Sequence, residues 1–121
     1  MHPARAILLF GHGSRDPLWR QPIDAVARRI RSEQPDTPVC CAFLELEQPD
    51  LADAARHLAD VGASRVTIVP MFLGTGRHAR EDLPLLVDEV RRAHPAIEFV
   101  LQPAVGEDPR LLDLLAKIAL A

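Results

Sequence analysis

Four short apolar runs, each followed by a helical pattern, constrain the fold most strongly. They cover residues 4–10, 38–46, 65–73 and 97–103. The runs are continuous rather than alternating, which is typical of strands covered on both faces of a parallel sheet. Four repeats of strand and helix predict a single α/β domain over residues 1–121, with a four-stranded parallel sheet and helices on both faces. Right-handed crossovers favour the flavodoxin-like strand order 2-1-3-4.

The four helical segments carry apolar residues at the spacing i, i+3, i+4, i+7, which predicts amphipathic helices. Asp50 is the expected N-cap of the second helix and Gly62 its expected C′ residue. Asp108 is the expected N-cap of the fourth helix, with Pro109 in its first turn. The apolar positions are Ile23, Val26, Ala27, Ile30; Leu51, Ala54, Ala55, Leu58; Leu83, Leu86, Val87, Val90; and Leu111, Leu114, Leu115, Ile118.

Composition argues against nucleic-acid and membrane partners. The chain of 121 residues has a net charge of −3 and contains four Phe, one Trp and no Tyr. Neither a base-stacking platform nor attraction to polyanionic surfaces is expected from these values. No apolar run approaches the roughly 20 residues of a membrane span, and the N-terminus is too short for a signal peptide.

Cys40 and Cys41 are the two cysteines of the chain and are adjacent in sequence. Side chains that are neighbours in a strand point to opposite faces, so this pair makes a poor structural disulfide. Two small buried thiols in a reducing compartment are the simpler interpretation. A cytoplasmic protein is therefore expected.

Two histidines close to glycines follow the first and third apolar runs. His12 lies between Gly11 and Gly13, and His78 comes two residues after Gly76. In the order 2-1-3-4, strands 1 and 3 are neighbours whose crossovers leave on opposite faces. This is the topological switch point, where ligands bind outside the carboxyl ends of the strands. We therefore expect both histidines to face one crevice.

The second run ends at the same edge of the sheet with two carboxylates. Glu45 and Glu47 are two residues apart, so they share a face if the strand extends that far. Imidazole and carboxylate side chains can bind a divalent transition metal or accept a proton near neutral pH. Two or three ligands from one chain leave a metal site incomplete, which suits a metal held briefly and passed on.

Arginines are concentrated at this predicted crevice. Guanidinium groups donate paired hydrogen bonds to carboxylates and phosphates, so a polyanionic ligand is expected. Glycines here let the backbone approach that ligand closely. The arginines are Arg15, Arg20, Arg77 and Arg80, and the glycines are Gly11, Gly13, Gly74 and Gly76.

Each of these residues also has a simpler structural interpretation. Ser14 or Asp16 can cap the first helical turn and leave His12 as a polar loop residue. His78 can be a surface residue at a helix start, with Asp82 as its helical neighbour or as a partner that fixes its tautomer.

Glu45 can be a solvated strand end, and each arginine can be a solvated surface residue. Trp19 is expected to pack over the first crossover. No function is assigned to His2, His57 and His94.

Three motifs identify a family resemblance. The segments "GHGSRDP", "FLELEQPDL" and "VPMFLGTGRHAREDLP" occur in this order at three predicted strand ends. Together they resemble the small, single-domain sirohydrochlorin chelatases, the cobaltochelatase type of the class II tetrapyrrole chelatases. The resemblance covers residues 5–118.

The resemblance implies ATP-independent insertion of Co²⁺, or alternatively Fe²⁺ or Ni²⁺, into sirohydrochlorin. The pathway leads to cobalamin, sirohaem or a nickel tetrapyrrole, and no cofactor is permanently bound. By resemblance, His12 and His78 are metal ligands and proton acceptors, and Glu45 is a further base or ligand. The eight carboxylates of sirohydrochlorin would account for the arginines. The implied substrate-binding residues are Gly11, Gly13, Ser14, Arg15, Gly76, Arg77 and Arg80.

The resemblance also implies a homodimer with the cleft between two subunits. The sequence departs from the family pattern at Gln48, where many members carry an acidic residue, while Glu47 lies one position earlier. The roles of positions 47 and 48 therefore stay open. The chain has neither the histidine-rich tail nor the C-terminal cysteine cluster of some relatives.

Two alternatives use the same residues. The first is a carrier that binds a metal or tetrapyrrole and delivers it without insertion. The second is a phosphate-handling enzyme with a phosphohistidine at His12, because "HGSR" places a histidine beside an arginine. The second alternative leaves His78 and Glu45 without a role.

Overall fold

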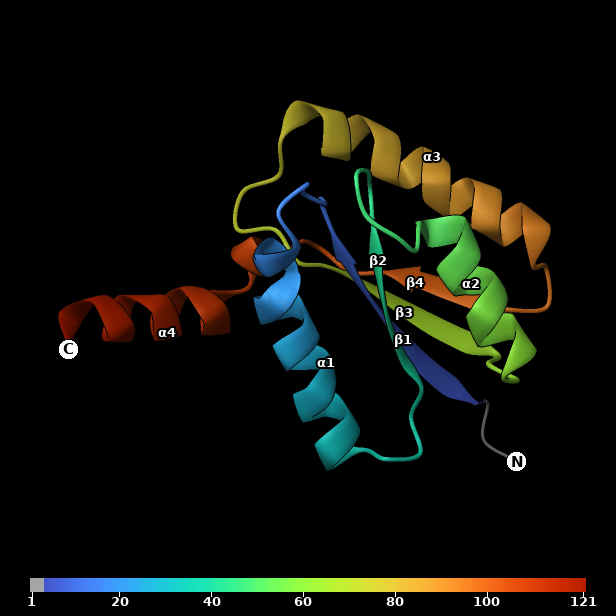
Figure 1. Ribbon diagram of the computed structural model, residues 1–121, viewed down its shortest axis with the longest axis horizontal. Helices are drawn as coiled ribbons and strands as arrows, with labels where there is room; N and C mark the ends of the chain where they lie inside the picture. The colour runs from blue at the N-terminus through green and yellow to red at the C-terminus, as the bar shows by residue number, and fades with distance from the viewer. Residues whose placement is uncertain (1–3) are drawn as a thin grey trace.

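The computed structural model describes residues 4–121, so His2 lies outside the described residues. Four parallel strands form one sheet in the order β2-β1-β3-β4 (Figure 1). The predicted parallel sheet and its strand order are confirmed. The strands are β1 (Arg5–Gly11), β2 (Val39–Phe43), β3 (Arg65–Pro70) and β4 (Glu98–Leu101).

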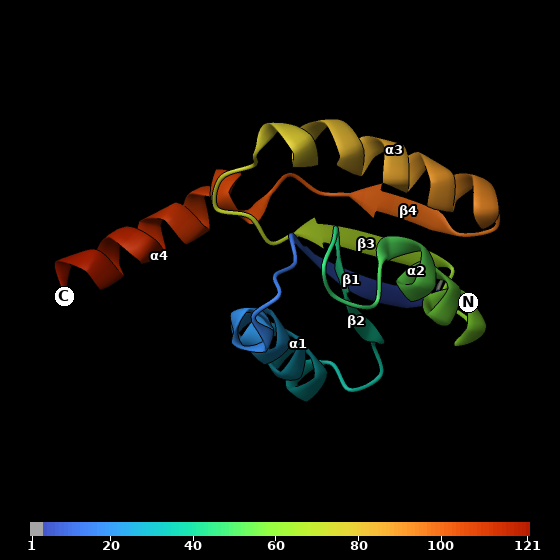
Figure 2. The same cartoon turned by 45° about the horizontal axis from the view of Figure 1, so that its top comes forward.

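Helices cover both faces of the sheet, and each face has its own core (Figure 2). On one face, α1 (Gln21–Glu33) packs on β1 and β2 through a small cluster that includes Ile23, Leu9 and Phe43. On the other face, α2 (Leu51–Asp60) and α3 (Arg77–Ala93) enclose the larger core, built on β1 and β3. The two clusters correspond to the alternating sides of the buried strands.

The predicted caps are confirmed. The Asp50 carboxylate accepts from the amide of Asp53 at 2.9 Å and begins α2. Gly62 follows α2 with a φ of +89°, which favours glycine. Asp108 accepts from the amide of Arg110 at 2.9 Å and begins α4 (Pro109–Leu120), with the proline in the first turn as expected.

The turn after β1 contains the other expected cap. The Asp16 side chain accepts from the amide of Leu18 at 2.9 Å and begins η1 (Pro17–Arg20), a short 3₁₀ helix that leads into α1. Trp19 lies edge-on to Phe43, with ring centroids 6.5 Å apart, so it packs over the first crossover as expected. It nevertheless keeps 40% of its surface exposed.

The second strand is shorter than its apolar run. It ends at Phe43, and the chain then turns through Leu46, whose φ is +65°. Because of this turn, Glu45 is exposed whereas Glu47 faces inward, with its Oε2 atom buried and without a hydrogen-bond partner. Glu45 and Glu47 were expected to share a face only if the strand extended that far, and this condition is not met.

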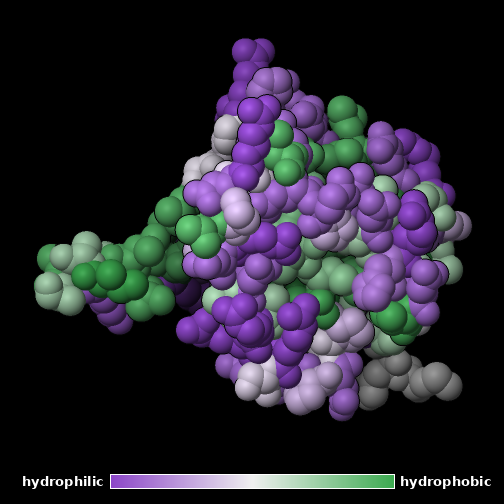
Figure 3. Space-filling view, in the orientation of Figure 1, coloured by the Kyte–Doolittle hydropathy of each residue, from purple (hydrophilic) through white to green (hydrophobic). Residues whose placement is uncertain are grey.

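The last helix projects from the rest of the molecule (Figure 1). It follows η2 (Val105–Glu107), and none of its residues is buried. Figure 3 shows apolar side chains along the projecting helix. The exposed large apolar residues of α4 are Leu112, Leu114, Leu115, Ile118 and Leu120.

The two cysteines are free thiols. Cys40 is half-buried and Cys41 is buried. Burial raises the pKa of both thiols, to about 11 for Cys41. Both groups are therefore protonated near neutral pH, which makes them poor metal ligands.

Among residues 4–121, the helices are all too short or too polar to cross a membrane.

Candidate functional site

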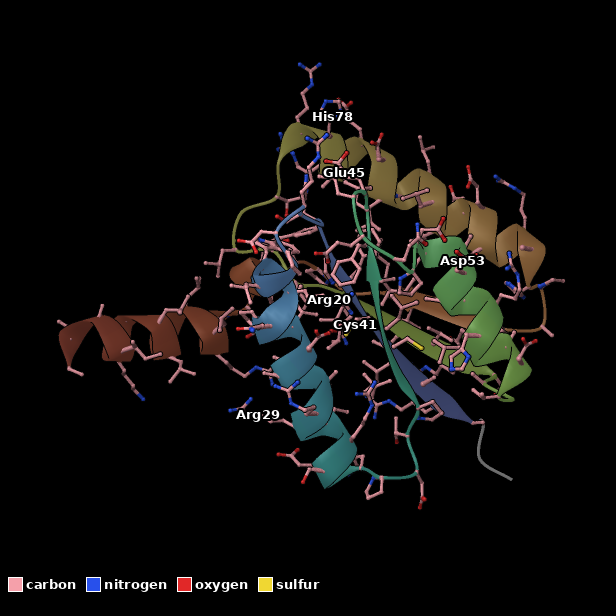
Figure 4. All side chains as sticks on the ribbon, viewed as in Figure 1. Arg20, Arg29, Cys41, Glu45, Asp53 and His78 are labelled. Atoms are coloured by element: carbon pink, nitrogen blue, oxygen red, sulfur yellow. The ribbon has the colours of Figure 1, made fainter. Side chains whose placement is uncertain are left out.

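The carboxyl edge of the sheet brings the predicted site residues to one cleft. β1 and β3 are adjacent and parallel, and their following segments diverge to α1 and α3 on opposite faces. Figure 4 shows Glu45, from the loop after β2, and His78, from α3, at the same end of the sheet. A cleft of about 310 Å³ is lined by His12, Leu44, Glu45, His78 and Asp82. The expectation that both histidines face one crevice is confirmed.

His12 and Glu45 form the closest pair in this cleft. The Nε2 atom of His12 lies 3.3 Å from Oε1 of Glu45, and both side chains are about half exposed. The amide of Leu44 donates to the carbonyl of Gly11 at 2.9 Å, and that of Glu45 donates to the carbonyl of His12 at 3.1 Å. The pairing of β1 with β2 thus continues past both strands, and the backbone places the two side chains together.

Gly13 is required by this arrangement. Its φ is +101°, and a Cβ atom at this position would overlap the carbonyl oxygen of Glu45. Gly11 also has a packing role, because a Cβ there would lie 2.7 Å from Cδ1 of Ile23. Both glycines therefore have a structural reason to be present, whether or not they contact a ligand.

Phe72 supports the imidazole of His12 from the core side. The two rings meet edge to face, with centroids 6.4 Å apart and planes at 69°, and Phe72 is 7% exposed. Phe72 lies within the third motif, but no role was predicted for it from the sequence. Its position near the end of the third apolar run, at the same edge of the sheet as His12, is the signal that could have identified it.

His78 lies in the first turn of α3, so its predicted position at a helix start is confirmed. Gly76 is the N-cap of this helix, and Arg77 is its first residue. Asp82 lies one helical turn beyond His78 and lines the same cleft. The first two turns of α3 therefore present an imidazole and a carboxylate to one cleft.

The arginines do not all surround the crevice. Arg77 is paired with Glu81 at 3.0 Å on the exposed surface of α3. Arg80 lines a neighbouring cleft of about 440 Å³, and Arg15 is exposed. Arg20 is turned inward, and its expected place at the crevice is wrong, because it hydrogen-bonds the Asp24 side chain and the backbone of the loop after β2.

The neighbouring cleft shares the start of α3 with the histidine cleft. Its walls are mainly apolar, with Phe72, Leu73 and Leu83 among them, and Arg80 lies beside them. A Cβ placed on Gly74 or Gly76 would meet no atom within 4 Å, so both glycines border open space. A largely apolar wall beside a guanidinium group suits a flat apolar ligand that carries anionic groups. Glu107 also lines this cleft, so an anionic group of such a ligand is expected to lie at Arg80 and away from that carboxylate.

The histidine cleft gathers side chains of the kinds that serve as metal ligands and proton acceptors. Two imidazoles and two carboxylates are accessible to solvent there, and both groups serve as ligands for first-row transition metals. Both can also take a proton from a bound reactant near neutral pH. Within residues 4–121, however, no three His, Cys, Asp or Glu side chains are close enough together to hold a metal ion.

An open parallel sheet with a histidine–carboxylate cleft at its switch point defines a small α/β ligand-binding protein. The sequence model of the CbiX family matches residues 6–119, so the chain belongs to the CbiX family. The predicted resemblance to small sirohydrochlorin chelatases is confirmed by this match and by the relatives of the chain.

The sirohydrochlorin cobaltochelatase of Methanothermobacter thermautotrophicus is 30% identical, over 93% of this chain and 89% of that protein. The sirohydrochlorin ferrochelatase of Priestia megaterium is 32% identical over 93% of this chain, which spans 42% of that protein.

Solved structures give the same relationship. The putative cobalamin biosynthesis CbiX protein of Marinobacter aquaeolei superposes with a TM-score of 0.82 at 27% identity, covering 95% of this chain and 93% of that one. The sirohydrochlorin chelatase SirB of Bacillus subtilis, solved in complex with cobalt, superposes with a TM-score of 0.78 at 27% identity. The match covers 93% of this chain and 48% of SirB.

Proposed function

We propose that this protein inserts a divalent metal ion into sirohydrochlorin without ATP. The convergence of His12, Glu45 and His78 on one cleft, in a chain of the CbiX family, carries this proposal. Co²⁺ is the favoured metal, and Fe²⁺ and Ni²⁺ are the alternatives. Relatives named cobaltochelatase and ferrochelatase both match the chain, which supports this choice of metals.

In the proposed reaction, the metal is a substrate held between His12 and His78. Insertion forms bonds from the metal to the four pyrrole nitrogens and releases two pyrrole protons. Glu45 lies 3.3 Å from His12, so the pair can accept a proton at the place where the metal is delivered. Asp82, one turn from His78, orients that imidazole or supplies a further oxygen ligand.

The tetrapyrrole is proposed to lie across both clefts. The apolar wall of Phe72, Leu73 and Leu83 suits the macrocycle, and Arg80 beside it suits one of the peripheral carboxylates. The remaining proposed contacts come from exposed groups and from backbone at the rim. These residues are Gly11, Gly13, Ser14, Arg15, Gly76 and Arg77.

The protein is proposed to act as a homodimer. A stripe of exposed apolar side chains runs along the projecting α4, and surface of this kind is expected to meet a partner. Two-fold symmetry lets the stripe of one copy pack on the second copy and vice versa. The second copy would bring its own histidines to a shared cleft and complete the metal coordination.

The remaining features of the proposal follow from chemistry and charge. No cofactor is permanently bound, since the only metal is the one transferred. Free thiols at Cys40 and Cys41 favour the reducing cytoplasm, and the net charge of −3 disfavours nucleic-acid and membrane partners. The product serves cobalamin or sirohaem synthesis.

Anaerobic absorption spectroscopy tests the proposal. Sirohydrochlorin is mixed with Co²⁺, Fe²⁺ or Ni²⁺, with and without protein, and the spectral change on metallation is timed. Multiple turnovers above the uncatalysed rate establish a chelatase and rank its metals. Tight tetrapyrrole binding without acceleration supports the carrier alternative, and no binding contradicts both.

A further inference from the structure

Arg20 joins the start of α1 to the loop that carries Glu45. Its guanidinium donates from Nε and Nη2 to both carboxylate oxygens of Asp24, at 2.9 and 3.1 Å. Its Nη1 atom donates to the carbonyl of Gln48 at 3.2 Å. The guanidinium carbon also lies 4.5 Å above the centre of the Phe43 ring. Arg20 therefore contacts the loop of residues 44–49 near its end and the strand residue before it.

This loop needs external restraint. Leu46 has a φ of +65°, which is costly for a residue with a branched side chain. Backbone strain of this kind persists only where the surroundings over-determine it. The amides of Leu44 and Glu45 bond the carbonyls of Gly11 and His12 at the start of the loop. At its end, the amide of Phe43 bonds the carbonyl of Pro49 at 3.0 Å, and Arg20 holds the adjacent carbonyl of Gln48.

The positive charge of Arg20 also interacts with a carboxylate of the loop, that of Glu47. The Asp24 side chain, and then the charges of Asp24 and Glu47, raise the pKa of Arg20. Glu47 has a buried Oε2 atom without a hydrogen-bond partner, so a nearby cation lowers the cost of burying this carboxylate. An uncharged residue at position 20 would remove the restraining bond to the exposed Gln48 carbonyl and the positive charge that favours the Glu47 carboxylate.

We propose that Arg20 is a positioning residue for metal insertion, which holds the loop of residues 44–49 so that Glu45 faces His12. The inference rests on the proposed function only for its effect on rate, whereas its effect on the loop is a property of the fold. It replaces the sequence-based expectation that Arg20 binds a substrate carboxylate, because all three of its guanidinium nitrogens donate to acceptors within the chain.

Hydrogen exchange tests the hold on the loop without any assay of activity. Arg20→Ala is expected to speed exchange at the amides of Leu44 and Glu45 by about tenfold, the effect of losing one hydrogen bond to a charged group. Arg31→Ala is the matched control, since Arg31 of α1 donates to the carbonyl of Val39 at 2.8 Å, at the other end of β2. Unchanged exchange at both loop amides in Arg20→Ala would overturn the proposal.

A double-mutant cycle tests the route to the reaction. Arg20→Ala is expected to lower kcat for metal insertion about tenfold while leaving KM for sirohydrochlorin within about twofold. In a Glu45→Ala background the same change is expected to have less than about a twofold effect, because the positioned carboxylate is already absent.

Two results of the cycle contradict the proposal. Equal losses in both backgrounds would show that Arg20 does not act through Glu45. A rise in KM with kcat unchanged would show that Arg20 binds the tetrapyrrole directly. Arg20→Lys keeps the positive charge but lacks the planar guanidinium fork. It is therefore expected to restore only part of the kcat that Arg20→Ala loses. An inactive wild-type protein would contradict the proposed function alone, since the exchange experiment decides the hold on the loop separately.

Discussion

The imidazole of His12 and the carboxylate of Glu45 meet at 3.3 Å because the backbones that carry them are hydrogen-bonded to each other. The amide of Glu45 donates directly to the carbonyl of His12, and Gly13 leaves room for the carbonyl of Glu45. The pair is therefore set by main-chain geometry as well as by side-chain attraction. The two residues belong to different motifs and are 33 positions apart in the chain.

Glu45→Gln is expected to lower the rate of metal insertion by at least about tenfold, because an amide cannot accept the proton that a carboxylate can. Because Glu45 is exposed, the melting temperature of the Glu45→Gln protein is expected to differ little from that of the wild type. The rate is measured by the absorption change on metallation. Glu89→Gln, an exposed site elsewhere on α3, is the matched control, and equal rates in the two variants would exclude a role for Glu45.

His78→Ala is expected to nearly abolish insertion while leaving the fold intact. His78 is exposed in the first turn of α3, and an exposed helical position accepts alanine readily. Insertion is assayed with Co²⁺ beside circular dichroism of the same sample. His57→Ala, at an exposed position on α2, provides the control. Full turnover by His78→Ala would contradict the metal-transfer model.

Gly13→Ala is expected to destabilise the protein by several kcal/mol and to lower insertion. The substitution combines a left-handed φ, which costs about 1–3 kcal/mol, with overlap of the new Cβ and the Glu45 carbonyl. Gly62→Ala is the control, because Gly62 also has a positive φ but open space around it. Urea unfolding compares the two variants. Similar losses of stability would show that the contact with Glu45 is unimportant.

Ile118→Asp is expected to convert a dimer into monomers. The residue is 63% exposed on the apolar stripe of α4, and a carboxylate there would be costly to bury against a second copy. Analytical ultracentrifugation measures the mass. Lys117→Asp introduces the same side chain at a position of α4 that is already charged, and is expected to leave the dimer intact. A wild-type protein that sediments as a monomer would refute the proposed interface.

The free energy of unfolding is expected to fall as the pH is raised from about 9 to about 11. Burial raises the pKa of the Cys41 thiol from 9.0 to about 11. Below pH 9 the thiol is protonated in both states, so its contribution is fully present. Above pH 9 the unfolded chain loses the proton first, and stability is lost until the native thiol also ionises.

A shift of this size corresponds to about 2 kcal/mol as an order of magnitude. Cys41→Ala is expected to show a shallower decline over the same interval, as measured by urea unfolding at several pH values. Parallel declines in the two proteins would assign the pH dependence to other groups.

Much of the fold could be predicted because its signals are local. Strands and helices were recognisable from apolar periodicity, and Asp50, Gly62 and Asp108 marked helix ends through their own hydrogen bonds and backbone preferences. The strand order followed from the handedness of short crossovers, which depends on chain chirality rather than on particular contacts. The same topology predicts that His12 and His78 lie at one edge of the sheet.

Tertiary structure decided what each charged side chain at that edge faces. Glu45 and Glu47 are alike in sequence context, yet the turn at Leu46 places one beside His12 and turns the other inward, with its Oε2 atom buried. Arg20 and Arg80 are equally plausible ligand-binding groups in sequence, yet the guanidinium of Arg20 hydrogen-bonds Asp24 and the Gln48 carbonyl. The sequence by itself determined the elements, their order and the residues that reach the edge. Partner choice among those residues depends on distances of a few ångströms between separate segments, which only the packed fold defines.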